Sequence, residues 1–99
     1  MEIEEFRDFI GKKFSVRVQE TQVDLELIHL QEFAPRLVPG LRERPFALLF
    51  RGPASPTQIE TLPRQVHDLY STDGKTFSIY LERVVGTGYP GTVYEAVFN

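Results

Sequence analysis

The sequence predicts a mainly β (α+β) domain, a small antiparallel barrel or sandwich of about six strands with one short N-terminal helix. Apolar and polar residues alternate with the two-residue period of a half-buried strand in several short segments, which turn residues separate. Only the start of the chain shows the three- and four-residue spacing of a helix. The 99 residues, 41% of them hydrophobic and 12% aromatic, suffice for one core. We therefore expect a single β-rich domain over residues 1–99.

The helix is predicted at the N-terminus, where Ile3, Phe6, Phe9 and Ile10 fall on one face. Glutamates precede this stretch and lysines follow it, which suits the helix dipole, and Gly11 is a stop signal. A helix this short is not stable alone. We therefore expect it to pack on a sheet, either closing one open end of a barrel or covering one face.

Two strands are predicted next, over residues 13–19 and 22–30, on either side of a polar turn. In the second strand the apolar residues change parity between Leu27 and Ile28. A β-bulge at this point would return the later apolar residues to the inner face and bend the strand. The alternative is that both faces of the strand are covered there.

Residues 46–50 form an unbroken apolar run between Arg44-Pro45 and Gly52-Pro53. Such a short run between turn residues is typical of a central strand that is covered on both faces. In the proline-rich stretch that follows, residues 55–58 resemble a helix start with a serine cap and proline at the first position.

The last third of the chain predicts three further strands. Residues 65–71 and 77–82 flank Asp73-Gly74, which is the strongest turn signal in the chain and indicates a tight hairpin. A glycine-rich loop follows, and the chain ends in a strand over residues 92–98. Hairpins between neighbours make an antiparallel sheet, and its closure would hide the sheet edges.

Catalytic and metal-binding signatures are missing from the sequence. The chain has no cysteine, which excludes disulfides, thiolate zinc sites and cysteine nucleophiles. Its two histidines, His29 and His67, fall on separate predicted strands without ligand or triad spacing. Gly86-Thr87-Gly88 lacks the further glycine and the helix of a phosphate loop. We predict a non-enzymatic protein without catalytic residues, cofactor or metal; a hydrolase using either histidine is the least favoured alternative.

The charge of the chain argues against nucleic acid and membrane partners. A net charge of −3 does not attract polyanions or an anionic lipid surface at long range. Tyr70 and Tyr80 flank the hairpin and offer stacking surfaces for single strands, but no basic groove accompanies them. No apolar run approaches the ~20 residues of a membrane helix, and the acidic start is unlike a signal peptide. A cytoplasmic location is expected, with signal-less export left open.

A protein partner or a second copy of the chain is the predicted partner, and the loop over residues 34–45 is the predicted contact surface. Apolar side chains ringed by arginine on an irregular segment are common in interfaces. The predicted partner-binding residues are Arg36, Leu37, Val38, Leu41 and Arg42. Alternatively, these side chains fold back and close one end of the barrel. The loop could be both a contact surface and such a closure if it exchanges between protomers.

A second functional alternative is a small-ligand or carbohydrate-binding barrel. Its mouth would be lined by the loop over residues 86–91, with Tyr89 as an aromatic contact. A pocket with convergent polar groups would favour this alternative.

The segments 44–53 and 94–99, together with Glu5-Phe6 near the start, resemble a family of short bacterial β-rich domains of unknown function. The resemblance implies a small β-rich domain without an assigned enzyme activity, associated with genes for phage-tail-collar-like proteins. Together with the loop, it leads us to expect an interaction or assembly module that is accessory to a phage-tail-like or surface-fibre system. In the same segments, Glu95 lies among apolar residues, which predicts an inward carboxylate paired with Arg51 or another arginine.

Overall fold

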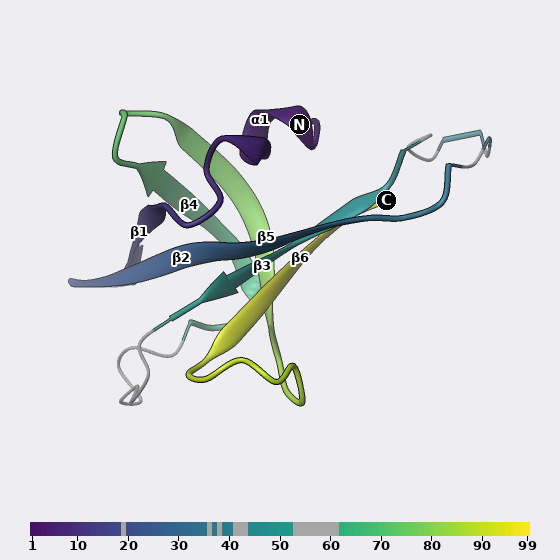
Figure 1. Ribbon diagram of the computed structural model, residues 1–99. Helices are drawn as coiled ribbons and strands as arrows, with labels where there is room; N and C mark the ends of the chain where they lie inside the picture. Colours follow the sequence, from purple (N-terminus) through teal and green to yellow (C-terminus); the bar gives the residue numbers. More distant parts are fainter. Residues whose placement is uncertain (19, 36, 38, 41–43, 53–61) are drawn as a thin grey trace.

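In the computed structural model of the chain, six antiparallel strands form a closed barrel. The structure describes all residues except 19, 36, 38, 41–43 and 53–61. A short helix, α1 (Glu4–Arg7), lies over one end of the barrel (Figure 1). The strands are β1 (Lys13–Val18), β2 (Thr21–Glu32), β3 (Phe46–Arg51), β4 (Gln65–Ser71), β5 (Thr76–Val84) and β6 (Val93–Phe98). The predicted fold class is confirmed, as a barrel rather than a sandwich. The predicted helix start at residues 55–58 lies outside the described residues.

The barrel consists of two three-stranded meanders joined along both of their outer strands. The order around the barrel is β1-β2-β3-β6-β5-β4, which brings β4 back beside β1. The junction of β3 with β6 is long, running from Phe46↔Phe98 to Arg51↔Val93. The junction of β1 with β4 is short, from Phe14↔Ser71 to Val16↔Leu69. The end of β1 therefore diverges from β4, and this divergence shapes the outer surface of the barrel.

The predicted bulge in β2 is confirmed. Leu27 pairs with Phe50 and His29 pairs with Leu49, so that Ile28 is the extra residue. Leu27 is fully buried before the bulge, and Leu30 packs against the core after it. The bulge thus keeps the apolar side chains of a long strand on the inner face.

The lumen of the barrel is filled by side chains. Phe6 of α1 is fully buried, and its ring centroid lies 4.9 Å from that of Phe77 and 6.1 Å from that of Phe98. Helix α1 therefore closes one end of the barrel, which is the first of the two predicted alternatives. The largest side chains that are completely buried with Phe6 are Tyr94, Phe14, Phe46, Phe50, Leu25, Leu27, Leu48, Leu69 and Leu81.

The predicted apolar face of the N-terminal helix is wrong at Ile10. The helix ends at Arg7, and the backbone continues in tight turns in which Phe9 N–H donates to the Phe6 carbonyl and Lys12 N–H donates to the Phe9 carbonyl. Three-residue turns bury Phe9 but rotate Ile10 outward, where it is 46% exposed. Strand β3 was predicted to be covered on both faces. Ala47 on its outward face is buried, in agreement with this prediction.

The predicted hairpin at Asp73-Gly74 is confirmed. Gly74 N–H donates to the Ser71 carbonyl at 3.2 Å, and Gly74 has a φ of 91°, as in loops that combine a type I turn with a left-handed glycine. The Asp73 carboxylate accepts hydrogen bonds from the Ser71 hydroxyl and from Lys75 N–H. The Ser71 hydrogen bond is the main reason why the pKa of Asp73 lies below its ordinary value.

We expect Asp73→Asn to make the unfolding of the protein less dependent on acid pH. A carboxyl group whose pKa is lowered by folding stabilises the native state above its unfolded pKa, and this contribution disappears as the pH falls through the folded pKa. Wild type should therefore have the higher Tm at pH 7, and the difference should vanish in strong acid. Thermal unfolding at both pH values checks this. An equal difference at both would show that the carboxylate charge is not responsible.

Candidate functional site

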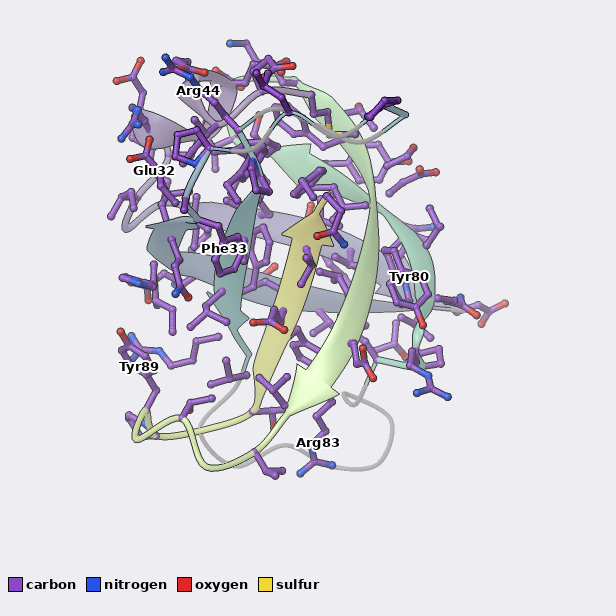
Figure 2. All side chains as sticks on the ribbon, turned by 90° about the vertical axis from the view of Figure 1, so that its right-hand side faces the viewer. Glu32, Phe33, Arg44, Tyr80, Arg83 and Tyr89 are labelled. Atoms are coloured by element: carbon purple, nitrogen blue, oxygen red, sulfur yellow. The ribbon has the colours of Figure 1, made fainter. Side chains whose placement is uncertain are left out.

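The candidate functional site lies where the β2–β3 hairpin extends past the end of the barrel. Beyond the last pair of the two strands, Phe33 N–H donates to the Pro45 carbonyl at 3.0 Å and continues the pairing. A pocket of about 240 Å³ lies between this extension and the N-terminal segment. We call it the hairpin notch; its lining residues are Ile3, Glu32, Phe33, Pro35, Arg44, Pro45 and Phe46. Figure 2 labels Glu32, Phe33 and Arg44 among them.

The notch has an apolar floor that belongs to the core of the barrel. Ile3 is 5% exposed and Phe46 is 1% exposed, and the ring of Phe46 stacks on that of Phe98 with the centroids 4.5 Å apart. Phe33 stands at the rim with 38% of its surface exposed. Core packing therefore holds the floor of the pocket in place, while Phe33, Pro35, Arg44 and Pro45 from the two ends of the loop complete its lining.

Charged side chains border the notch. Arg7 of α1 forms an ion pair with Glu32 at the end of β2, which connects the helix to the hairpin extension. Both side chains of this pair are at least half exposed, so it contributes little stability. Arg44 is exposed and makes no ion pair with a carboxylate in the described part of the chain. The notch therefore offers an apolar floor beside one available positive charge.

One of the five predicted partner-binding residues can be placed. Leu37 lies on the protruding loop and is 86% exposed, so its side chain does not fold back on the barrel. The other four predicted residues, Arg36, Val38, Leu41 and Arg42, lie outside the described residues.

Sequence reasoning missed Phe33 and Arg44 as parts of this surface. Phe33 was not singled out, and Arg44 fell within the predicted contact loop but was not among the five predicted partner-binding residues. The available signal was a phenylalanine placed directly between a charged strand end and a proline-rich loop, where a core position is not expected.

Among the described residues, neither histidine side chain is hydrogen-bonded to a serine or a carboxylate. His67 is 4% exposed, and its Nε2 donates to the Pro63 carbonyl at 2.8 Å, which requires the proton on that nitrogen. The neighbouring Asp68 points to the opposite face and accepts a hydrogen bond from Ser78. His29 is exposed on β2. Within the described residues, no three histidine, aspartate or glutamate side chains are grouped as metal ligands.

The predicted pairing of Glu95 with Arg51 is wrong. Arg51 instead donates to Glu26 at 3.1 Å, because these two residues are directly opposite in the β2–β3 ladder. Glu95 is half-buried on the outer face of β6, between Leu49 on β3 and Glu82 on β5. An inward orientation is impossible because the neighbouring Tyr94 and Ala96 occupy the core face.

The loop over residues 86–91 is organised by a local contact. Tyr89 N–H donates to the Thr87 hydroxyl at 3.2 Å, and the Tyr89 side chain is 39% exposed. Ligand binding at this loop stays a prediction. In the part of the chain that the structure describes, no helix has both the length and the apolar character needed to cross a bilayer.

Fold and site together define a small, side-chain-filled β-barrel domain that carries an apolar pocket at the base of a protruding hairpin. A family model described as Domain of unknown function (DUF6916) matches residues 1–98, and the chain belongs to this family. The match supports one part of the resemblance noted in the sequence, namely that the chain is a domain of unknown function. Comparisons with curated proteins and with solved structures gave no match.

Proposed function

We propose that this domain is a non-enzymatic interaction module that binds a protein partner, or a second copy of itself, through the hairpin notch and the adjoining Leu37. Two observations carry the proposal: the pocket has an apolar floor held by core packing, and Leu37, two residues after the lining residue Pro35, is 86% exposed. Adjacent apolar groups on a protruding element, bordered by arginine, are typical of protein interfaces. The engagement of His67 by a backbone carbonyl supports a structural rather than catalytic use of that residue.

The dimensions and charge of the notch suggest the chemistry of the partner. Its volume of about 240 Å³ is below the roughly 300–1,000 Å³ of pockets for drug-sized ligands, and suits a single apolar side chain. Arg44 would meet a carboxylate next to that side chain. The favoured partner segment therefore carries an aromatic or aliphatic residue close to an aspartate or glutamate.

The biological setting of this interaction is proposed from the family resemblance. The resemblance of segments 44–53 and 94–99 to short bacterial domains implies an association with genes for phage-tail-collar-like proteins. We therefore propose that the partner belongs to a phage-tail-like or surface-fibre assembly. Binding of a small ligand inside the barrel is disfavoured because Phe6, Phe14 and the other buried side chains fill the lumen.

The test compares two variants of the proposed contact surface, Leu37→Ser and Arg44→Glu, here called the notch variants, with two matched controls. Leu37→Ser and Arg44→Glu should each reduce self-association or partner capture by about tenfold. Val85→Ser and Arg83→Glu should leave both unchanged: Val85 is as exposed as Leu37, at 85%, and Arg83 lies at the opposite end of the molecule in Figure 2. Light scattering gives the mass of the isolated protein, and quantitative mass spectrometry compares what each variant captures from lysate.

The four variants separate this proposal from non-specific association. A partner that is retained by both controls and lost by both notch variants identifies the notch as the interface. If all four variants lose it, or all four retain it, the notch is not the binding surface.

A further inference from the structure

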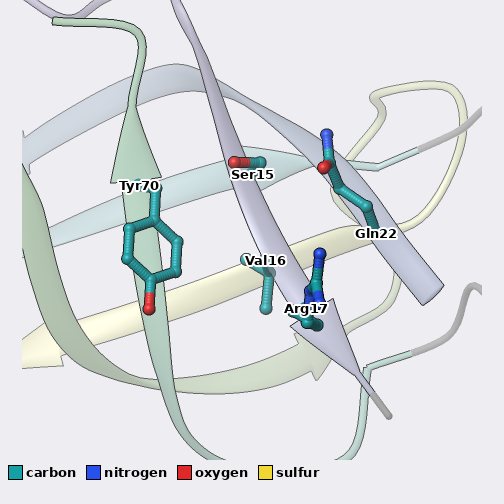
Figure 3. A pocket seen from close by; sticks show the side chains of 5 residues that line it. All are labelled: Ser15, Val16, Arg17, Gln22 and Tyr70. Atoms are coloured by element: carbon teal, nitrogen blue, oxygen red, sulfur yellow. The ribbon is translucent and has the colours of Figure 1, made fainter. Parts of the chain in front are cut away.

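A second hollow lies on the outer face of the barrel, across β4, β1 and β2 (Figure 3). It has a volume of about 440 Å³ and is lined by Ser15, Val16, Arg17, Gln22 and Tyr70. A smaller hollow of about 260 Å³ shares Ser15, Gln22 and Tyr70 and extends toward Lys13 and Asp24. We call the outward side chains of this continuous surface, Lys13, Ser15, Arg17, Gln22, Asp24 and Tyr70, the tyrosine groove.

The groove exists because a small side chain lies between larger ones. Ser15 on β1 is directly opposite Tyr70 on β4 and Asp24 on β2. Its short side chain forms the floor, while Tyr70 stands on one side of β1 and Gln22 on the other (Figure 3). The divergence of β4 from β1 after Val16↔Leu69 widens the groove toward Arg17.

Tyr70 provides an aromatic surface that the fold does not use. Its side chain is 47% exposed, although most aromatic residues of the chain are in the core. The ring is carried by a strand that is paired on both sides, which fixes the backbone at Tyr70 and the side of the sheet that the ring faces. Such a surface can stack against a flat, partly apolar ring.

The polar groups opposite Tyr70 include both acceptors and donors. Gln22 Nε2 donates to Asp24 Oδ1 at 3.1 Å, which orients both side chains and leaves the Gln22 carbonyl and the other Asp24 oxygen as acceptors. Lys13 and Arg17 lie at the two ends of the groove as donors. Within the described residues, neither makes an ion pair.

We propose that the tyrosine groove binds a neutral saccharide. A sugar ring has an apolar C–H face that stacks on an aromatic ring, and hydroxyls that need donors and acceptors side by side. The Asp24 carboxylate, which lines the smaller hollow, and the net charge of −3 disfavour a polyanion such as single-stranded nucleic acid. An apolar peptide side chain would displace the water that solvates Gln22 and Asp24, and it could not replace the lost hydrogen bonds. The site shares no residue with the hairpin notch, so each proposal stands or fails alone.

The test is titration of the ¹⁵N-labelled protein with maltotriose, cellotriose and triacetylchitotriose, followed by two-dimensional NMR. At least one of these trisaccharides should shift the amide signals of the groove residues saturably, with a Kd on the order of 1 mM, as expected for a shallow site. Tyr70→Ala should weaken this binding by about tenfold. Ser15→Leu retains Tyr70 but fills the floor of the groove, and it should abolish trisaccharide binding.

Tyr80→Ala is the matched control, because Tyr80 is 49% exposed on the outer face of β5 and does not line the groove. It should bind like wild type. An oligothymidylate is titrated in parallel as the nucleic-acid probe. Three results would overturn the proposal: no trisaccharide shifts the groove signals, the shifts persist unchanged in both groove variants, or the oligothymidylate alone shifts them.

Discussion

Replacing Phe6 with alanine should lower the free energy of unfolding by about 3–5 kcal/mol, the usual cost of removing a buried phenylalanine. Phe6 is fully buried, and its ring contacts those of Phe77, Phe98 and Phe46 at centroid distances of 4.9, 6.1 and 6.3 Å. The substitution would open a cavity where α1 closes the barrel. Since small domains are stable by only about 5–15 kcal/mol, a large share of the total would be lost.

Urea denaturation measures this loss, and Ile10→Ala is its control. Ile10 is four residues further along the same segment but is 46% exposed, so its truncation should cost less than about 1 kcal/mol. If the two variants are equally destabilised, α1 does not act as a closure of the core. A change in the midpoint without a change in slope would show that the loss is one of stability.

Replacing Tyr94 with phenylalanine should cost about 1–3 kcal/mol, although only one oxygen atom is removed. The Tyr94 hydroxyl accepts a hydrogen bond from the backbone N–H of Leu62 at 2.9 Å, and Tyr94 and Leu62 are 1% and 4% exposed. Without the hydroxyl, this buried N–H loses its acceptor while the aromatic ring keeps its packing. The bond also fixes the segment before β4 against β6.

Hydrogen exchange separates this effect from general destabilisation. In Tyr94→Phe, the Leu62 amide should exchange faster than the amides of β3 and β6, which global unfolding governs. Tyr89→Phe is the control, since Tyr89 is 39% exposed and its hydroxyl makes no hydrogen bond with the described residues; its stability should stay within about 0.5 kcal/mol of wild type. Unchanged stability in Tyr94→Phe would mean that water replaces the hydroxyl.

The strands of this protein could be predicted from sequence because their signals are local. The two-residue period of Phe77, Ile79 and Leu81 places their side chains on one face whatever the rest of the chain does. The parity change at Leu27-Ile28 located the bulge for the same reason, since a strand with one buried face must return its apolar residues to that face. The Asp73-Gly74 turn follows from the backbone conformations that these residues favour.

The length of α1 was not predictable in this way. The helical spacing of Phe6 and Ile10 is real, but the chain after Arg7 is fixed by partners distant in sequence. Gly11 N–H donates to the Leu27 carbonyl, and Leu27 N–H donates to the Lys12 carbonyl. These bonds to β2 replace the hydrogen bonds that would have continued the helix, and so turn Ile10 to solvent.

The local sequence thus determined which residues form strands, which side of each strand is apolar, and that the chain carries no thiol chemistry. Only the tertiary structure decided the two candidate sites. The notch joins Ile3, Phe33 and Arg44 from separate segments, and the groove depends on Tyr70 lying opposite Ser15 where β4 meets β1. Periodicity orients a side chain relative to its own strand. Which strands become neighbours, and in what register, follows from closing the whole barrel around one core.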